Sequence, residues 1–123
     1  MDYEEARRQA LAAVDAFNRR DLDALVAVMH EEMTHLGSMA DRHLGQEPGR
    51  VEGKPAFRDF VRWLWEQEPP LRIVLEEVFT GPRGYVYLTR REHDGARIAF
   101  VREVDADGLI RSQRAYYSRP SAG

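Results

Sequence analysis

The sequence of 123 residues contains no cysteine. Disulfide bonds, thiolate metal sites and cysteine nucleophiles are therefore excluded. The sequence also has no apolar run near the ~20 residues that a membrane-spanning helix needs, so we expect no association with a membrane. The first residues, MDYEEARRQA, are charged and do not resemble a secretory leader. We therefore expect a cytoplasmic protein.

The chain also lacks an excess of positive charge. It carries 18 Lys and Arg residues against 21 Asp and Glu residues, which gives a net charge of −3. Nucleic-acid-binding domains usually carry a basic excess, so we expect no nucleic-acid partner. A chain of this length predicts a single domain over residues 1–123. Such a domain buries enough surface on folding to form one core and one pocket.

The hydrophobic pattern divides the chain into a helical part and a strand part. Helical spacing of apolar residues predicts helices over residues 3–18, after Asp21, and from Lys54 to the Pro69-Pro70 pair. A short strand over 32–37 and a polar loop over 38–53 separate the second and third helices. Runs rich in Val, Ile, Tyr and Phe predict four further strands, over residues 71–79, 84–92, 97–104 and 109–118.

This order of elements predicts an α+β fold. Three N-terminal helices should pack on one face of a mainly antiparallel sheet, because helices and hairpins occupy separate blocks of the sequence. The Asp94-Gly95 pair between two of the strands is a strong signal for a tight hairpin turn.

Four short segments carry motifs of a known family. They are the stretch around Asp21-Leu22-Asp23-Ala24-Leu25, Val51–Phe57, Val104–Ile110 and Arg114–Tyr117. In this order and spacing they resemble the SnoaL-like branch of the nuclear-transport-factor-two-like superfamily. The resemblance implies a strongly curved sheet, a cone-shaped α+β barrel and an internal pocket between the sheet and the helices. It also implies a homodimer through the sheet face.

Side chains on alternate strand positions point to one face of a sheet, so the resemblance also implies which residues line the pocket. Aligned with the family, the inward positions are His35, Gly37, Leu88, Arg90, Glu92, Ile98, Phe100, Arg102, Gln113, Ala115 and Tyr117. A register error of one residue would turn a whole strand over.

The chain departs from two enzyme types of this fold. Ketosteroid isomerases use a Tyr, a carboxylate base and a protonated Asp, and their positions correspond here to Ala13, Gly37 and Phe100. Isomerase activity by that route is therefore excluded. Epoxide hydrolases of the fold use an Asp-Arg-Asp set. Arg90 and Glu92 match two of its members, but the third position holds an alanine.

His35 is the best single candidate for chemistry. An imidazole with an ordinary pKa near 6.5 is suited to act as a base or an acid near neutral pH. Glu92 or Tyr117 would orient it, and Arg90 or Arg102 would hold an enolate or a carboxylate. The alternative is a histidine packed in the core. For Arg90 and Glu92, the alternative is a ladder of charges on the outer surface of the sheet.

We expect no metal and no other cofactor. His30 and His35 are five residues apart, whereas a helical zinc motif needs a spacing of four. Aromatic residues of the third helix, including Phe60 and Trp63, either line an aromatic cavity or belong to the core. Tyr85 and Tyr87 should lie on the face opposite the pocket, where exposed aromatics would favour a dimer interface.

Three functions remain open. The first is a cofactor-independent acid/base enzyme acting on a small, apolar, oxygenated substrate by cyclisation, isomerisation, dehydration or epoxide opening. Its catalytic residues would be His35, Glu92 and Arg90. Its substrate-binding residues would be Tyr117, Gln113, Arg102, Phe100, Leu88, Phe60 and Trp63. The second is a non-catalytic ligand-binding module, and the third is a dimeric protein-interaction domain of the same shape.

Overall fold

The computed structural model describes residues 1–118 and confirms the α+β class. Within this range the elements run in the order α1 (Tyr3–Asn18), α2 (Leu22–Val26), β1 (Met29–Gly37), α3 (Ser38–Leu44), β2 (Arg50–Glu52), α4 (Lys54–Trp65), β3 (Ile73–Gly81), β4 (Gly84–Arg91), β5 (Arg97–Val104) and β6 (Ile110–Tyr117). No helix in the described part of the chain is long and apolar enough to cross a membrane.

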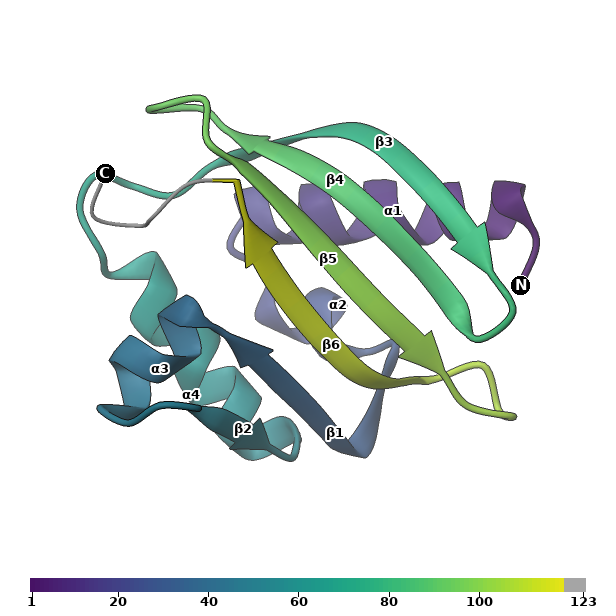
Figure 1. Ribbon diagram of the computed structural model, residues 1–123, viewed down its shortest axis with the longest axis horizontal. Coiled ribbons are helices and arrows are strands. Elements are labelled where there is room, and N and C mark those ends of the chain that lie inside the picture. The colour runs from purple at the N-terminus through teal and green to yellow at the C-terminus, as the bar shows by residue number, and fades with distance from the viewer. Residues whose placement is uncertain (119–123) are drawn as a thin grey trace.

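The strands form one curved, open sheet in the order β2-β1-β6-β5-β4-β3 (Figure 1). The strands from β3 to β6 form an antiparallel meander, and β1 joins β6 in parallel. The parallel pairing brings the N-terminal strand beside the last one, so residues 78 positions apart in sequence face each other. This arrangement places the candidate site at the centre of the sheet.

Helix α1 lies against β3 on one face of the sheet (Figure 1). Its first turn is capped by the Asp2 side chain, which accepts a hydrogen bond from Glu5 N at 2.8 Å. Its last residue, Asn18, accepts from Ile73 N at 3.0 Å and donates to Ile73 O at 2.8 Å. This two-point contact fixes the end of α1 to the start of β3.

Helix α4 covers β1 and forms the second wall of the interior. It begins after Gly53, and Pro55 is accepted in its first turn because the nitrogen there has no helical partner. Its buried side chains are Phe57, Phe60, Val61 and Leu64. The concave face of the sheet, α1 and α4 therefore enclose the core.

Two parts of the sequence prediction for the N-terminal half are wrong. Residues 38–53 are not a loop, because they contain α3 and the short strand β2. Both are too short to produce a clear hydrophobic period: β2 buries only Val51, which pairs with His35. The strand expected over 32–37 also begins earlier, because β1 starts at Met29, although Met29 continues the helical spacing of the preceding residues.

Candidate ligand-binding cavity

A cavity of about 50 Å³ lies between the concave face of the sheet and helices α1 and α4. Its walls are mostly apolar, and none of its lining residues within the described chain is an aspartate or a glutamate. We call it the inner cavity. Its lining residues are Ala13, Phe17, Leu25, His35, Phe57, Phe60, Val61, Leu64, Leu71, Ile73, Tyr87, Ile98, Phe100, Arg102, Gln113, Ala115 and Tyr117.

A row of polar side chains crosses the sheet at one side of this cavity. His35 on β1 is paired with Gln113 on β6, Gln113 with Arg102 on β5, and Arg102 with Tyr85 on β4. Each pair is directly opposite in the strand register, so all four side chains point to the same face. Each is buried, with at most 4% of its surface exposed. We call these four residues the polar row.

The polar row is joined by hydrogen bonds along its whole length. Arg102 Nε donates to Gln113 Oε1 at 2.7 Å, and Arg102 Nη1 donates to the Tyr85 hydroxyl at 3.0 Å. The Tyr85 hydroxyl donates in turn to Gln9 Oε1 on α1 at 3.0 Å. At the other end, Gln113 Nε2 lies 3.1 Å from His35 Nδ1. Helix α1 and four strands are thus linked through buried polar atoms.

This chain of contacts determines the tautomer of His35. A guanidinium only donates, so the Gln113 oxygen must face Arg102 and its amide N–H groups must face His35. His35 Nδ1 is therefore the acceptor, and the proton of the neutral ring lies on Nε2. Phe60 and Phe57 hold the ring in place, with centroid distances of 4.9 and 5.5 Å.

Burial, together with the positive charge of Arg102, lowers the pKa of His35 to about 3. The imidazole is therefore neutral at physiological pH, which corrects the expectation of an ordinary pKa near 6.5. No hydrogen-bond partner of Nε2 exists within residues 1–118. The ring is thus set up as a hydrogen-bond donor, since its single lone pair is already engaged by Gln113.

Arg102 is a buried positive charge with no carboxylate beside it in the described structure. Its guanidinium carbon lies 5.0 Å from the ring centroid of Tyr87 and 5.9 Å from that of Tyr85, so the two aromatic faces partly offset the charge. Burial raises the pKa of Tyr87 to about 12, although Arg102 opposes the rise, and its hydroxyl stays neutral. The interior therefore carries one net positive charge at this point.

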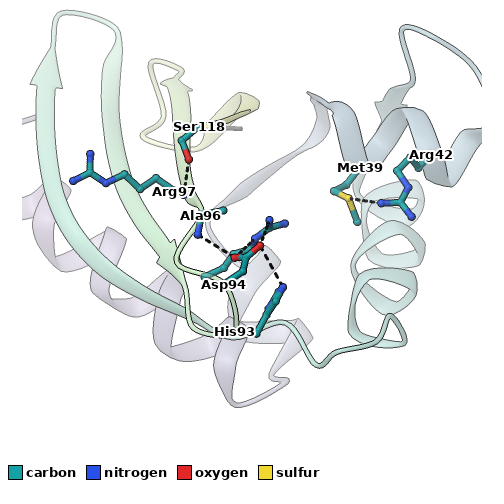
Figure 2. A network of polar contacts seen from close by, with 8 residues as sticks. Met39, Arg42, His93, Asp94, Ala96, Arg97 and Ser118 are labelled. Atoms are coloured by element: carbon teal, nitrogen blue, oxygen red, sulfur yellow. Dashed lines mark hydrogen bonds and ion pairs between the residues drawn. The ribbon is translucent and has the colours of Figure 1, made fainter. Parts of the chain in front are cut away.

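A second, larger cavity of about 320 Å³ adjoins the first and shares Leu64, Leu71 and Tyr117 with it. We call it the outer cavity. Its remaining lining residues are Met39, Arg42, Gln67, Glu68, Pro69, Arg91, His93 and Asp94. Figure 2 shows Met39 and Arg42 on one side and the β4–β5 hairpin on the other. Burial raises the pKa of Tyr117 to about 12, so a neutral phenol stands between the two cavities.

The hairpin side of the outer cavity is held rigid by Asp94. Its carboxylate accepts from Arg91 Nε at 3.1 Å, from Arg91 Nη2 at 2.7 Å and from Ala96 N at 3.0 Å (Figure 2). The bond from Ala96, followed by those from Arg91, lowers the pKa of Asp94. Because Arg91 is neutralised in this way, Arg42, on the opposite side of the outer cavity, is the lining arginine without an ion pair in residues 1–118.

Six of the residues predicted for the site line the inner cavity. They are His35, Phe60, Phe100, Arg102, Gln113 and Tyr117. Ile98 and Ala115 line it as predicted from the strand alternation, and Gly37 adjoins Ala115 and the Nε2 atom of His35. The alternation predicted for β1, β5 and β6 is therefore confirmed.

The predicted facing of β4 is wrong. Arg90 lies on the outer face of the sheet, where its Nε is 3.5 Å from Glu76, and Glu92 lies in the following turn, 3.9 Å from Arg72. Leu88 also points outward. The antiparallel register pairs Leu88 with Ala99 and Tyr87 with Phe100, so odd-numbered residues of β4 share the inner face with even-numbered residues of β5.

The wrong facing of β4 also placed Tyr85 and Tyr87 on the wrong side of the sheet. They were predicted to be exposed, but each is only 3% exposed and both point inward. The hairpin sequence indicates the correct facing of β4, because a turn centred on Asp94-Gly95 pairs odd-numbered positions of one strand with even-numbered positions of the next. Trp63, which is predicted to line the pocket, instead packs against His43 of α3 with a centroid distance of 5.1 Å and an interplanar angle of 47°.

Fold and cavity together define a small α+β domain with a sheet-and-helix pocket. A family model of the SnoaL-like domain matches residues 10–112, and the chain belongs to this family. Comparison with curated protein sequences gave no match. Within residues 1–118, no three His, Asp or Glu side chains are grouped as they would be around a metal ion.

Solved structures show the same fold at low sequence identity. A SnoaL-like protein of unknown function from Burkholderia thailandensis has a TM-score of 0.87 and 20% identity, covering 97% of this chain and 99% of that one. A putative ketosteroid isomerase from Kribbella flavida has a TM-score of 0.71 and 18% identity, with 95% and 80% covered. TerC, crystallised with polyporic acid, has a TM-score of 0.75 and 16% identity, with 92% and 91% covered.

Proposed function

We propose that this protein binds a small, mostly apolar molecule that carries an oxygen atom at one end. The oxygen-bearing end would enter the inner cavity and accept a hydrogen bond from His35 Nε2. The remainder would occupy the outer cavity. The observation that carries this proposal is the polar row, which presents only donors toward an otherwise apolar interior.

The sizes of the two cavities support this division. Ligand pockets usually measure ~300–1,000 Å³, which fits the outer cavity of about 320 Å³ and not the inner one of about 50 Å³. The inner cavity exceeds the roughly 30 Å³ share of one liquid water, but it is well below the ~150 Å³ cavity that holds benzene. It therefore suits a group of a few atoms. One protein of this fold, TerC, was crystallised with polyporic acid.

Two alanines of α1 allow a matched test. Ala13 lines the inner cavity and Ala12 is exposed one position away, so Ala13→Leu fills the cavity whereas Ala12→Leu does not. We expect ketones, phenols, epoxides or carboxylates to raise the melting temperature of the wild type and of Ala12→Leu, and not that of Ala13→Leu. Equal responses of the two variants would place binding elsewhere, and a flat response of the wild type would refute the proposal.

An acid/base enzyme acting through His35 is the second candidate. A neutral imidazole that donates from Nε2 is suited to polarise a carbonyl group, and this is the observation that favours it. The same geometry opposes proton abstraction, because the lone pair of His35 is engaged and the described lining contains no carboxylate. Exchange of the α-hydrogens of cyclohexanone in D₂O tests it. Exchange above the buffer rate that is lost in His35→Gln would establish the enzyme, and its absence would leave a binding protein.

A further inference from the structure

We infer that the ligand is an organic acid, bound with its carboxylate in the inner cavity and its apolar body in the outer cavity. This rests on the proposed function and adds the charge and the orientation of the ligand. The carboxylate would be the counter-ion of Arg102, which the protein itself does not supply.

The electrostatic state of Arg102 favours an anionic ligand. A guanidinium is always protonated in proteins, and burying such a charge is costly unless an opposite charge accompanies it. Arg102 is only 2% exposed, and its side-chain partners in residues 1–118 are the neutral groups of Gln113, Tyr85 and Tyr87. The bonds to Gln113 and Tyr85 engage Nε and Nη1, and the described lining of the cavity holds no acidic side chain.

The neighbours of Arg102 in the cavity also favour an anion. Gln113 holds His35 with its Nε2–H as a donor, and the phenols of Tyr87 and Tyr117 remain protonated. A carboxylate only accepts hydrogen bonds, so it matches a wall of donors around a cation. A ligand amine would meet a like charge, and a neutral amide would leave the charge of Arg102 uncompensated.

The relative sizes of the two cavities indicate the direction in which the ligand enters. The inner cavity has room for a group of a few atoms, and the outer cavity adjoins it at Tyr117, Leu64 and Leu71. Met39, Pro69 and Leu71 supply apolar surface there, and the outer cavity is larger by several-fold. The size of the inner cavity therefore favours entry of the small charged head first, with the apolar body against Met39, Pro69 and Leu71.

Calorimetric titration with hexanoate and hexanamide at pH 7.5 tests the charge. Hydrogen bonds to a charged group contribute more than neutral ones, so we expect the wild type to bind hexanoate at least about tenfold more tightly than hexanamide. The ratio should fall to about one in Arg102→Met and persist in Arg114→Met, which removes an exposed arginine on the outer face of β6. Equal affinities in the wild type would overturn this inference and leave the proposed function standing. If neither compound binds, both fail.

A chain-length series tests the orientation. Acetate, butyrate and hexanoate share the head, and each added CH₂ group should tighten binding about three- to fourfold if it enters an apolar cavity. No gain along the series would mean a bare anion site and would overturn the head-first arrangement.

A measurement on the wild type removes any dependence on the folding of Arg102→Met. The Nε–H resonance of Arg102, which belongs to a buried guanidinium, should shift when hexanoate is added and stay unchanged with hexanamide. An unchanged resonance with bound hexanoate would contradict the role assigned to Arg102.

Discussion

The Nε atom of Arg102 lies 2.7 Å from Oε1 of Gln113, and this contact determines which hydrogen-bonding groups Gln113 and His35 present in the interior. It turns the amide of Gln113 so that its N–H groups face His35 Nδ1. Arg102 therefore sets the tautomer of a histidine two strands away. Because the three residues lie opposite one another in the register, one alteration in the row changes the hydrogen bonding of the others.

The first prediction concerns pH. His35 is held neutral with a pKa of about 3, whereas in the unfolded chain it should have its ordinary value near 6.5. Between these values the unfolded chain binds a proton that the folded protein does not, so the free energy of unfolding falls as the pH drops through this window. Below about pH 6 the slope from this group is about 1.4 kcal/mol per pH unit.

His35→Gln removes this contribution. Urea unfolding at pH 7, 6, 5 and 4 should show the variant gaining stability relative to the wild type by a few kcal/mol as the pH falls. A difference between the two proteins that stays constant from pH 7 to pH 4 would mean that His35 ionises freely in the folded state.

The second prediction separates Arg102 from Gln113. Gln113→Leu should lower the free energy of unfolding by about 1–3 kcal/mol, because it leaves buried groups of both Arg102 and His35 without partners. Arg102→Met should cost less than this or nothing, since it removes a buried charge that has no ion pair.

The double variant then reports the coupling. The double variant Arg102→Met/Gln113→Leu should lose less free energy of unfolding than the two single variants lose in sum. Most of the loss in Gln113→Leu arises because the buried Arg102 is left without its acceptor, and Arg102→Met removes that buried donor. Strict additivity within about 0.5 kcal/mol would show that the two side chains do not depend on each other.

The third prediction concerns the uncovered face of the sheet. Helix α1 covers only one face (Figure 1), and the opposite face carries Phe79 and Tyr116, which are 50% and 55% exposed, beside Val86, Leu88 and Val101. We expect this face to pair with that of a second copy. The tyrosines first expected there are buried, so the prediction now depends on these other residues.

Sedimentation at about 50 µM measures the association. The wild type should be a dimer, Phe79→Arg should be a monomer, and Tyr3→Arg, on the exposed part of α1, should remain a dimer. A monomeric wild type would show that the apolar outer face has another role.

The sequence sufficed for those elements that have a strong period or a clear turn. Helices α1 and α4 and the meander from β3 to β6 were predicted within a few residues, because their apolar spacing and the Pro and Gly breaks agree. Helix α3 and strand β2 were missed, since a short helix and a three-residue strand offer too few positions for a period to appear.

The candidate site was predicted only in part, because the hydrophobic pattern determines the facing of some strands and not of others. Strand β6 alternates buried and exposed positions, so Gln113 was correctly placed. Strand β4 carries Tyr85 and Tyr87 on one face and Val86 and Leu88 on the other, so hydrophobicity alone could not choose between them. The link between Arg102 and His35 depends on hydrogen-bond geometry across three strands, which no local pattern contains.

¹⁵N NMR of the imidazole shows whether His35 Nε2–H faces a ligand site. In the free protein at pH 7 the spectrum should show a neutral ring protonated at Nε2, as the Arg102–Gln113 contact requires. Saturating hexanoate or cyclohexanone should shift the Nε2 resonance and leave Nδ1 nearly unchanged. A ring protonated at Nδ1, or an Nε2 resonance indifferent to every ligand that binds, would contradict the account.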